Sequence, residues 1–201
     1  GKGFTDITTR QQIQLRWFTI EHVPQIWERL KAVGLITLQT GMDNIRNVVG
    51  CPVAGLTPNE LFDASPVARQ FTQMFVGDKA YTNLPRKFNV TITGCKENCT
   101  HAESQDVALT PAMKEIAGEE VKGFNVAVGG KMGSGGMTVA QPLDVRAHEA
   151  IHVEGREGGR ALDDAVLDLA RHVAADHVGA DQQDDEAEEH EALEEGEPAG
   201  Q

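Results

Sequence analysis

The chain has 201 residues and a formal net charge of -13 at pH 7, and residues 146–201 account for all of that charge because they hold four arginines, no lysine and 17 acidic residues. No run of about 18 apolar residues predicts a membrane span and the amino-terminus lacks a signal-peptide pattern, so we expect a cytoplasmic protein with no membrane or nucleic-acid partner. Three cysteines, an odd number, argue against a disulfide framework.

Residues 1–40 predict a strand, a helix and a second strand. Over residues 7–18, β-branched and apolar residues are interleaved with threonine, arginine and glutamine, which is typical of a strand with one polar face. Arg10, Gln14 and Arg16 share that face.

The apolar spacing becomes helical over residues 23–33, with Pro24 near the start and Gly34 just past the end. Residues 35–38 predict a short strand. A strand, a helix and a strand in this order look like half of a ferredoxin-like α+β unit, which needs a partner half to close its sheet.

Residues 41–145 predict a second lobe of mixed helix and strand. The elements are a strand at 45–49, a Gly/Pro loop at 50–58, a helix at 67–75, and strands at 87–93, 107–109 and 124–128. Gly129 to Gly136 is a glycine-rich turn of the kind that lets the backbone approach a ligand. Because Met132 follows Lys131 where a Walker loop requires Ser or Thr, a plain turn is favoured over a nucleotide role.

Cationic side chains lie among rigid turn and strand signals in two motifs, at residues 41–47 and 83–89. On the second motif's strand, Arg86 and Lys87 point to opposite faces, while Lys87 and Asn89, two residues apart, face the same way. Such fixed cations are typical of a site that binds an anionic cofactor.

Several separated motifs follow one another in a fixed order along the chain. They are Thr8-Thr9-Arg10-Gln11, Gln14-Leu15-Arg16, Met42-Asp43-Asn44-Ile45-Arg46-Asn47, Leu84-Pro85-Arg86-Lys87-Phe88-Asn89 and Gly123-Phe124-Asn125-Val126-Ala127-Val128-Gly129-Gly130. Together, over residues 5–145, they resemble the first half of the ferredoxin-dependent nitrite and sulfite reductases.

The resemblance implies an enzyme of two homologous halves that holds sirohaem coupled to a [4Fe-4S] cluster and reduces nitrite to ammonia or sulfite to sulfide. Sirohaem carries many carboxylates and the substrates are anions, so the pocket must present fixed cations. The implied cofactor-binding residues are Arg10, Gln14, Arg16, Arg46 and Lys87. The implied catalytic residues are Lys87, Asn89 and Arg46.

Asn89 bears on the choice of substrate. Sulfite reductases of the family typically carry a second lysine at this position, and the doubly charged sulfite gains more from two cations than nitrite does. Asparagine therefore favours nitrite, with a sulfite reductase as the alternative.

Cys95 and Cys99 imitate a cysteine pair of the cluster site, with C-x3-C spacing. Their place between the two strand motifs is that of the first repeat, whereas the family's cluster ligands belong to the second, and a cubane needs four thiolates. We therefore interpret both as non-ligating, Cys51 as a buried small residue, and we assign no metal ligand.

Residues 146–201 form an acidic tail that we expect to be mostly disordered, with one possible amphipathic helix at 161–173. The tail contains His148-Glu149-Ala150-Ile151-His152, which matches the zinc-protease pattern H-E-x-x-H. Because Gly158 occupies the third-ligand position and no apolar scaffold surrounds the motif, a chance match is favoured over a zinc site.

The predicted class is α+β, with a ferredoxin-like half domain at 1–40, a sirohaem/4Fe-4S-type domain at 41–145 and the tail at 146–201. We interpret the chain as a fragment of an assimilatory nitrite reductase of nitrate assimilation, truncated with a shifted reading frame after Val145. The parent enzyme would take electrons from reduced ferredoxin. We expect this chain alone to be inactive, and the remaining alternative is a non-catalytic remnant that binds nothing.

Overall fold

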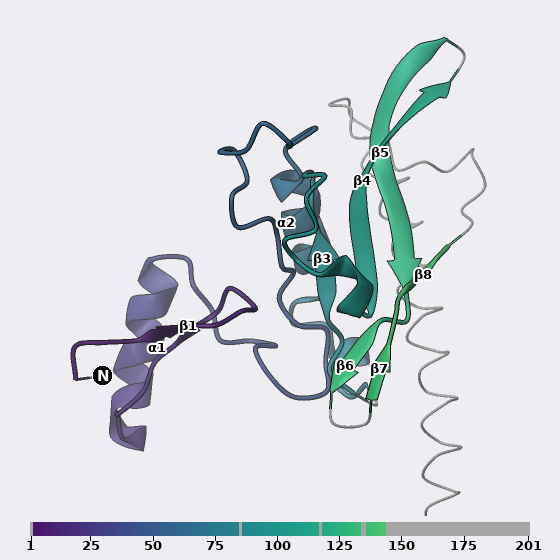
Figure 1. Ribbon diagram of the computed structural model, residues 1–201. Helices are drawn as coiled ribbons and strands as arrows, with labels where there is room; N and C mark the ends of the chain where they lie inside the picture. Colours follow the sequence, from purple (N-terminus) through teal and green to yellow (C-terminus); the bar gives the residue numbers. More distant parts are fainter. Residues whose placement is uncertain (1, 85, 117, 134–135, 144–201) are drawn as a thin grey trace, which may run out of the picture.

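The computed structural model describes residues 2–84, 86–116, 118–133 and 136–143. Helices and strands are mixed along the chain (Figure 1), which confirms the α+β class. The predicted acidic tail, its H-E-x-x-H motif and the helix at 161–173 lie outside the described residues.

The amino-terminal segment is a hairpin rather than one long strand. β1 (Asp6–Ile7) pairs antiparallel with β2 (Ile13–Gln14). The prediction of a single strand over 7–18 is wrong because the chain reverses between β1 and β2, where Gln11 has a φ of 59° and its N–H donates to the carbonyl oxygen of Thr8 at 2.9 Å. A positive φ is uncommon for glutamine, so the conformational preferences of these residues did not predict the turn.

A helix follows the hairpin, as predicted. A short 3-10 turn, η1 (Ile20–His22), leads into α1 (Val23–Ala32), which has proline in its first turn. The predicted strand at 35–38 is wrong: residue 35 donates its N–H back to the carbonyl oxygen of Leu30 at 2.9 Å, and residues 35–38 pair with no strand among the described residues.

The central sheet has four strands in the order β3-β4-β5-β8. β3 (Val90–Ile92) is parallel to β4 (Val107–Ile116), which is antiparallel to β5 (Glu119–Val128), and β5 is antiparallel to β8 (Gln141–Pro142). β4 and β5 are longer than predicted because they pair along their whole length, and their hairpin projects past the helix-covered part of the sheet (Figure 1).

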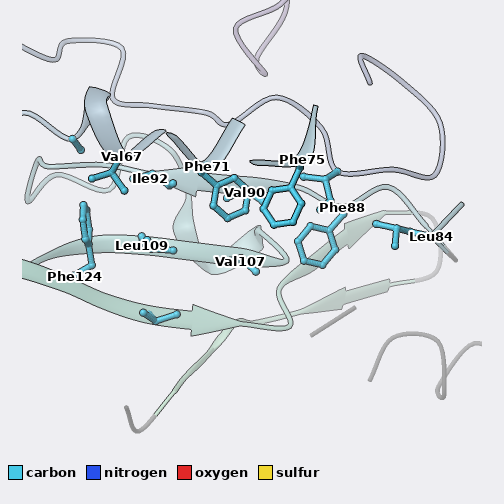
Figure 2. Packing of buried hydrophobic residues seen from close by; sticks show 13 residues of the cluster. Val67, Phe71, Phe75, Leu84, Phe88, Val90, Ile92, Val107, Leu109 and Phe124 are labelled. Atoms are coloured by element: carbon cyan, nitrogen blue, oxygen red, sulfur yellow. The ribbon is translucent and has the colours of Figure 1, made fainter. Parts of the chain in front are cut away.

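α2 (Ser65–Phe75) covers one face of this sheet and supplies its main apolar contacts. Figure 2 shows helix side chains packed on strand side chains, and the labelled members of this core are Val67, Phe71, Phe75, Leu84, Phe88, Val90, Ile92, Val107, Leu109 and Phe124. Burying each large apolar side chain contributes about 1.5–3 kcal/mol. The core therefore fixes the sheet that carries the predicted site.

An irregular segment, residues 44–50, extends the sheet beside β3. Ile45 bridges Phe88 and Val49 bridges Thr91, both in parallel. Three residues lie between Ile45 and Val49, but only two lie between their bridge partners Phe88 and Thr91. The 44–50 segment therefore carries a bulge, which interrupts the predicted 45–49 strand.

The glycine-rich segment forms a small hairpin of β6 (Lys131–Gly133) and β7 (Gly136–Thr138). Just before it, Gly130 packs so tightly on backbone that a Cβ there would lie 2.6 Å from the carbonyl oxygen of Glu103. This glycine therefore admits neighbouring protein backbone.

Two further 3-10 turns, η2 (Lys79–Tyr81) and η3 (Ala102–Ser104), complete the described elements. Among the described helices, none combines the length and the apolar character that crossing a bilayer would require.

Candidate functional site

Arg10 joins the amino-terminal hairpin to the sheet. Its Nη1 donates to Gln105 Oε1 at 3.1 Å and its Nη2 donates to the carbonyl oxygen of Asn47 at 3.0 Å. Asn47 returns a hydrogen bond from Nδ2 to the carbonyl oxygen of Arg10 at 2.7 Å. The guanidinium thus links the hairpin turn, the bulge beside β3 and the loop before β4.

Gln11 makes a second link next to the first. Its Nε2 donates to the carbonyl oxygen of Gly50 at 2.6 Å, and the Gly50 N–H donates to Gln11 Oε1 at 3.1 Å. The hairpin turn is therefore held on the 44–50 segment by two consecutive side chains.

The guanidinium of Arg10 is in a cation-rich, partly desolvated place. Burial lowers the pKa of Arg10, the positive charge of Arg46 lowers it further, and Asp106 opposes both effects. Arginine stays protonated in proteins, so the guanidinium keeps its charge and a nearby anion such as Asp106 stabilises it.

Several buried polar atoms of this region have no hydrogen-bond partner. They are Arg10 Nε, Arg46 Nε, Asn47 Oδ1 and Asn89 Oδ1. Each buried unsatisfied group costs about 1–3 kcal/mol. Two of the four are charged donors, so the described residues present hydrogen-bonding capacity suited to the oxygens of an anionic group.

The sheet brings Arg46 close to the second predicted motif. The Arg46 N–H donates to the carbonyl oxygen of Phe88 at 2.9 Å. Because Ile45 and Phe88 bridge each other and are both buried in the core, strand alternation sends Arg46, Lys87 and Asn89 toward the opposite face.

Lys87 and Asn89 differ in how firmly they are held. Lys87 is exposed and makes no hydrogen bond or ion pair within the described part of the chain. The Asn89 N–H donates to Asp106 Oδ2 at 2.7 Å. The same carboxylate attracts the guanidinium of Arg10 and raises its pKa.

Arg16 lies on the exposed surface of the hairpin. It forms an ion pair with Asp6 and donates from Nη2 to Gln14 Oε1 at 2.9 Å, with 55% of its side chain exposed. The single polar face predicted for Arg10, Gln14 and Arg16 is not formed, because Arg10 belongs to the turn and not to a continuous strand.

A cavity of about 540 Å³ lies between the hairpin, α1 and α2. Gln14, Arg46 and Asn47 supply polar lining, and most of the wall is apolar, including Leu30 and Phe75. Among the described residues, Lys87 and Asn89 do not line this cavity. Arg46 and Lys87 therefore lie on the same face of the sheet, but only Arg46 lines the cavity.

The sequence did not single out Gln105, Asp106 or the docking role of Gln11. Gln105 is 95 positions from Arg10, and nothing in the local pattern connects them. Asn47 belongs to the motif at residues 41–47, but the sequence predicted no role for it. Its position next to Arg46 was the feature that could have indicated one.

Of the two cofactors that the resemblance implies, the residues of this chain suit sirohaem but not the [4Fe-4S] cluster. Unpaired guanidinium donors suit a carboxylate-rich macrocycle such as sirohaem. They do not suit a [4Fe-4S] cluster, which needs four thiolates where the chain has three cysteines, and the described residues contain no group of three or more metal-ligating side chains.

Two family models match the chain. The model of the ferredoxin-like half domain of nitrite/sulfite reductases matches residues 1–33, and the model of the nitrite and sulphite reductase 4Fe-4S domain matches residues 41–177. The second match runs past residue 145, where the resemblance was expected to stop.

Curated relatives resemble the chain closely over part of their length. An assimilatory ferredoxin-dependent nitrite reductase of Haloferax mediterranei is 45% identical over 75% of this chain and 27% of the relative. A ferredoxin–nitrite reductase of Leptolyngbya laminosa is 43% identical over 71% of this chain and 28% of the relative. The chain thus spans about a quarter of the length of these relatives.

Solved structures agree at the level of fold. The Mycobacterium tuberculosis NirA protein matches with a TM-score of 0.61 and 32% identity, over 69% of this chain and 24% of that protein. Dissimilatory sulfite reductase I matches with a TM-score of 0.65 at 12% identity, over 87% of this chain and 56% of that one, which supports the fold alone.

Proposed function

The chain belongs to the nitrite and sulphite reductase family, and we propose that it forms the first part of the sirohaem pocket of an assimilatory ferredoxin-dependent nitrite reductase. Reduced ferredoxin would be the electron donor of the whole enzyme, nitrite its substrate and the cytoplasm its location. The ferredoxin-like half domain would occupy residues 1–40 and the first sirohaem-type domain 41–145.

Arg10 and Arg46 would hold the macrocycle. Each offers a buried Nε with no partner, and the two guanidiniums are close enough that the charge of Arg46 lowers the pKa of Arg10. A carboxylate between them would satisfy both donors and relieve their repulsion. Gln14, at the end of β2, and Arg16, just after it, would contact the same cofactor at its edge.

Lys87 and Asn89 would handle the substrate. When bound, sirohaem would supply the iron that takes up nitrite and would pass on the electrons that ferredoxin provides. The Lys87 ammonium would hold the anion, offer a proton to its oxygens and reach the cofactor's carboxylates. Asn89 would orient the anion by donating hydrogen bonds from its side-chain amide nitrogen Nδ2.

Nitrite is preferred to sulfite in this proposal because Asn89 is neutral. Close to the anion, a second cation is worth about 4 kcal/mol per unit charge at 4 Å and an effective dielectric of 20. Its absence penalises a dianion more than a monoanion.

The cluster would depend on residues outside this chain. Cys51, Cys95 and Cys99 are all free thiols, and a [4Fe-4S] cluster takes four thiolates. Nitrite reduction would therefore belong to the whole enzyme, and the chain alone would bind the macrocycle without completing the reaction.

The observation that carries this proposal is the pair of unpaired guanidinium Nε atoms on Arg10 and Arg46. It is tested by anaerobic titration of the full chain with sirohaem, followed by absorption. We expect a saturable spectral shift, and Arg46→Gln should weaken binding about tenfold to a hundredfold, since a hydrogen bond to a charged group is worth about 1.5–3 kcal/mol.

Arg29→Gln is the matched control, because Arg29 is an exposed residue in the last turn of α1. It should bind sirohaem as the unmodified chain does. Equal affinities for the Arg29 and Arg46 variants, with circular dichroism unchanged in both, would refute the assigned pocket.

A further inference from the structure

Cys51 and Cys95 are 44 positions apart but lie on neighbouring segments. Val49 bridges Thr91, and the Ile92 N–H donates to the carbonyl oxygen of Val49 at 3.1 Å. Cys51 follows Val49 by two residues, and Cys95 follows Ile92 by three. The parallel pairing therefore carries both cysteines past the same edge of the sheet.

The two thiols interact with each other. Cys51 lies close enough to Cys95 to raise the pKa of its thiol, and both thiols are free. Cys95 is 2% exposed, whereas Cys51 is half-buried and open to solvent. The structure thus places an accessible thiol near a buried one on the adjacent segment.

Cys95 is also held in place by its neighbours. Its N–H donates to Thr93 Oγ1 at 3.1 Å, and its Sγ accepts the Glu97 N–H at 3.4 Å. Burial raises the pKa of the Cys95 thiol, the Glu97 N–H lowers it, and the adjacent Cys51 raises it again. Cys95 is consequently poorly suited to react first but well placed to react second.

Cys99 is outside this pair. It is exposed, and its Sγ contacts Glu97 Oε2 at 3.9 Å. The C-x3-C spacing suggests a joint role for Cys95 and Cys99, yet the neighbouring segment brings Cys51 close to Cys95.

We propose that Cys51 and Cys95 form a reversible intramolecular disulfide when the chain meets a low-molecular-weight disulfide such as oxidised glutathione. The Cys51 thiolate attacks one sulfur of oxidised glutathione, forming a mixed disulfide and releasing one glutathione thiolate. The Cys95 thiolate then attacks the Cys51 sulfur and releases the second glutathione. The two protons of the cysteines pass to the two glutathiones, which are reduced as the cysteines are oxidised.

The disulfide would reinforce the docking of the hairpin. Gly50, next to Cys51, exchanges two hydrogen bonds with Gln11. Fixing Cys51 to Cys95 holds the Gly50 backbone in the position that Gln11 recognises. The bond needs no bound cofactor, so it stands apart from the proposed sirohaem pocket.

The test uses the full chain, reduced and then incubated with excess oxidised glutathione. After alkylation, mass spectrometry should find no alkyl group on Cys51 or Cys95, and a proteolytic peptide that joins the Cys51 and Cys95 segments. A protein disulfide that joins Cys99 to Cys51 or Cys95, a persistent glutathione adduct on Cys51, or an absence of reaction at both Cys51 and Cys95 would each overturn the proposal.

Two variants separate the pair from general thiol reactivity. Cys99→Ser should form the same cross-link at the same rate, because Cys99 takes no part. Cys51→Ser should leave Cys95 reduced while circular dichroism stays unchanged. In denaturant the unmodified chain should lose its preference for the Cys51–Cys95 link, since only the folded sheet brings those thiols together.

Discussion

Arg10 serves two purposes at the level of single residues. Its two terminal nitrogens hold the hairpin to Gln105 and Asn47, and its Nε is left without a partner. Lysine could keep the charge but could not span both acceptors, because its single ammonium has no planar fork.

Replacing Arg10 by lysine should therefore loosen the hairpin. We expect the free energy of unfolding to fall by about 1–2 kcal/mol, since two hydrogen bonds of about 0.5–1.5 kcal/mol each are lost or weakened. Urea denaturation measures this change. Arg16→Lys is the control, and its effect should stay within about 0.5 kcal/mol because Arg16 pairs on the exposed surface. Equal losses would show that the Arg10 contacts carry no docking energy.

Asn89 is the residue at which substrate choice can be changed. Asn89→Lys adds a second cation on the strand face shared with Lys87, and in sirohaem-loaded protein it should tighten sulfite binding more than nitrite binding. Spectral titration with each anion gives the two affinities. An unchanged ratio would mean that position 89 does not face the bound anion.

The buried thiol of Cys95 gives stability a dependence on pH. Its pKa is raised above the ordinary value of 9.0, chiefly by burial, so the folded state holds the proton more tightly than the unfolded state. That contribution is fully present below the ordinary pKa and is lost as pH rises through the folded pKa.

Cys95→Ala is the matched comparison for this effect. The stability difference between the reduced unmodified chain and this variant should shrink as pH rises above the ordinary pKa of a thiol. Urea denaturation under reducing conditions at a series of pH values measures it. A difference that stays constant across that range would contradict the assignment.

At the level of elements, the sequence was most informative where one periodicity held for many residues. The apolar spacing of α1 and α2 predicted both helices, because a helical stripe needs only local residues to be recognised. β3, β4 and β5 were placed correctly but were given the wrong lengths, since strand pairing is set by a distant partner.

The errors at this scale have one physical cause. The hairpin turn between β1 and β2, the bulge at residues 45–49 and the absence of pairing at 35–38 all depend on contacts with distant backbone or on their lack. Arg10 and Arg46, both proposed from the sequence as cofactor-binding residues, lie close enough to interact electrostatically. Gln105 could not be identified from the sequence, because its partner Arg10 is 95 positions away.

Gly130 is an element-scale position where one added carbon should reduce stability. A Cβ there would collide with backbone of Glu103 and Gln105, which cannot move as a flexible side chain would. Gly130→Ala should cost about 1–3 kcal/mol of stability by overpacking.

Gly133→Ala is the control for that substitution, because a Cβ at Gly133 meets nothing within 4 Å. Thermal or urea denaturation of both variants measures the difference. Equal stabilities would mean that the β6–β7 hairpin does not pack against the η3 loop as described.

For the whole molecule, the two lobes differ in how much they bury. α1 has no buried residue, whereas Val67, Phe71 and Phe75 of α2 are buried in the core. Many large apolar side chains of the amino-terminal lobe are exposed, including Ile7, Trp17 and Ile20. Its attachment to the sheet depends strongly on Arg10 and Gln11.

Hydrogen exchange should reveal this difference. We expect amides of α1 and of the β1–β2 hairpin to exchange before those of α2, β3 and β4, since local opening of the first lobe exposes little buried surface. Mass-spectrometric exchange on the full chain measures it. Equal protection of α1 and α2 would indicate one cooperative unit.

The central claim for the whole molecule is that Arg10 and Arg46 together receive a carboxylate-bearing macrocycle. The most direct measurement is an NMR titration of the arginine Nε–Hε signals with sirohydrochlorin, the metal-free and diamagnetic form of the ring. Saturable shifts of the Arg10 and Arg46 signals, with those of Arg29 and Arg69 unchanged, are the predicted result. Unmoved Arg10 and Arg46 signals, or equal shifts at all four arginines, would contradict it.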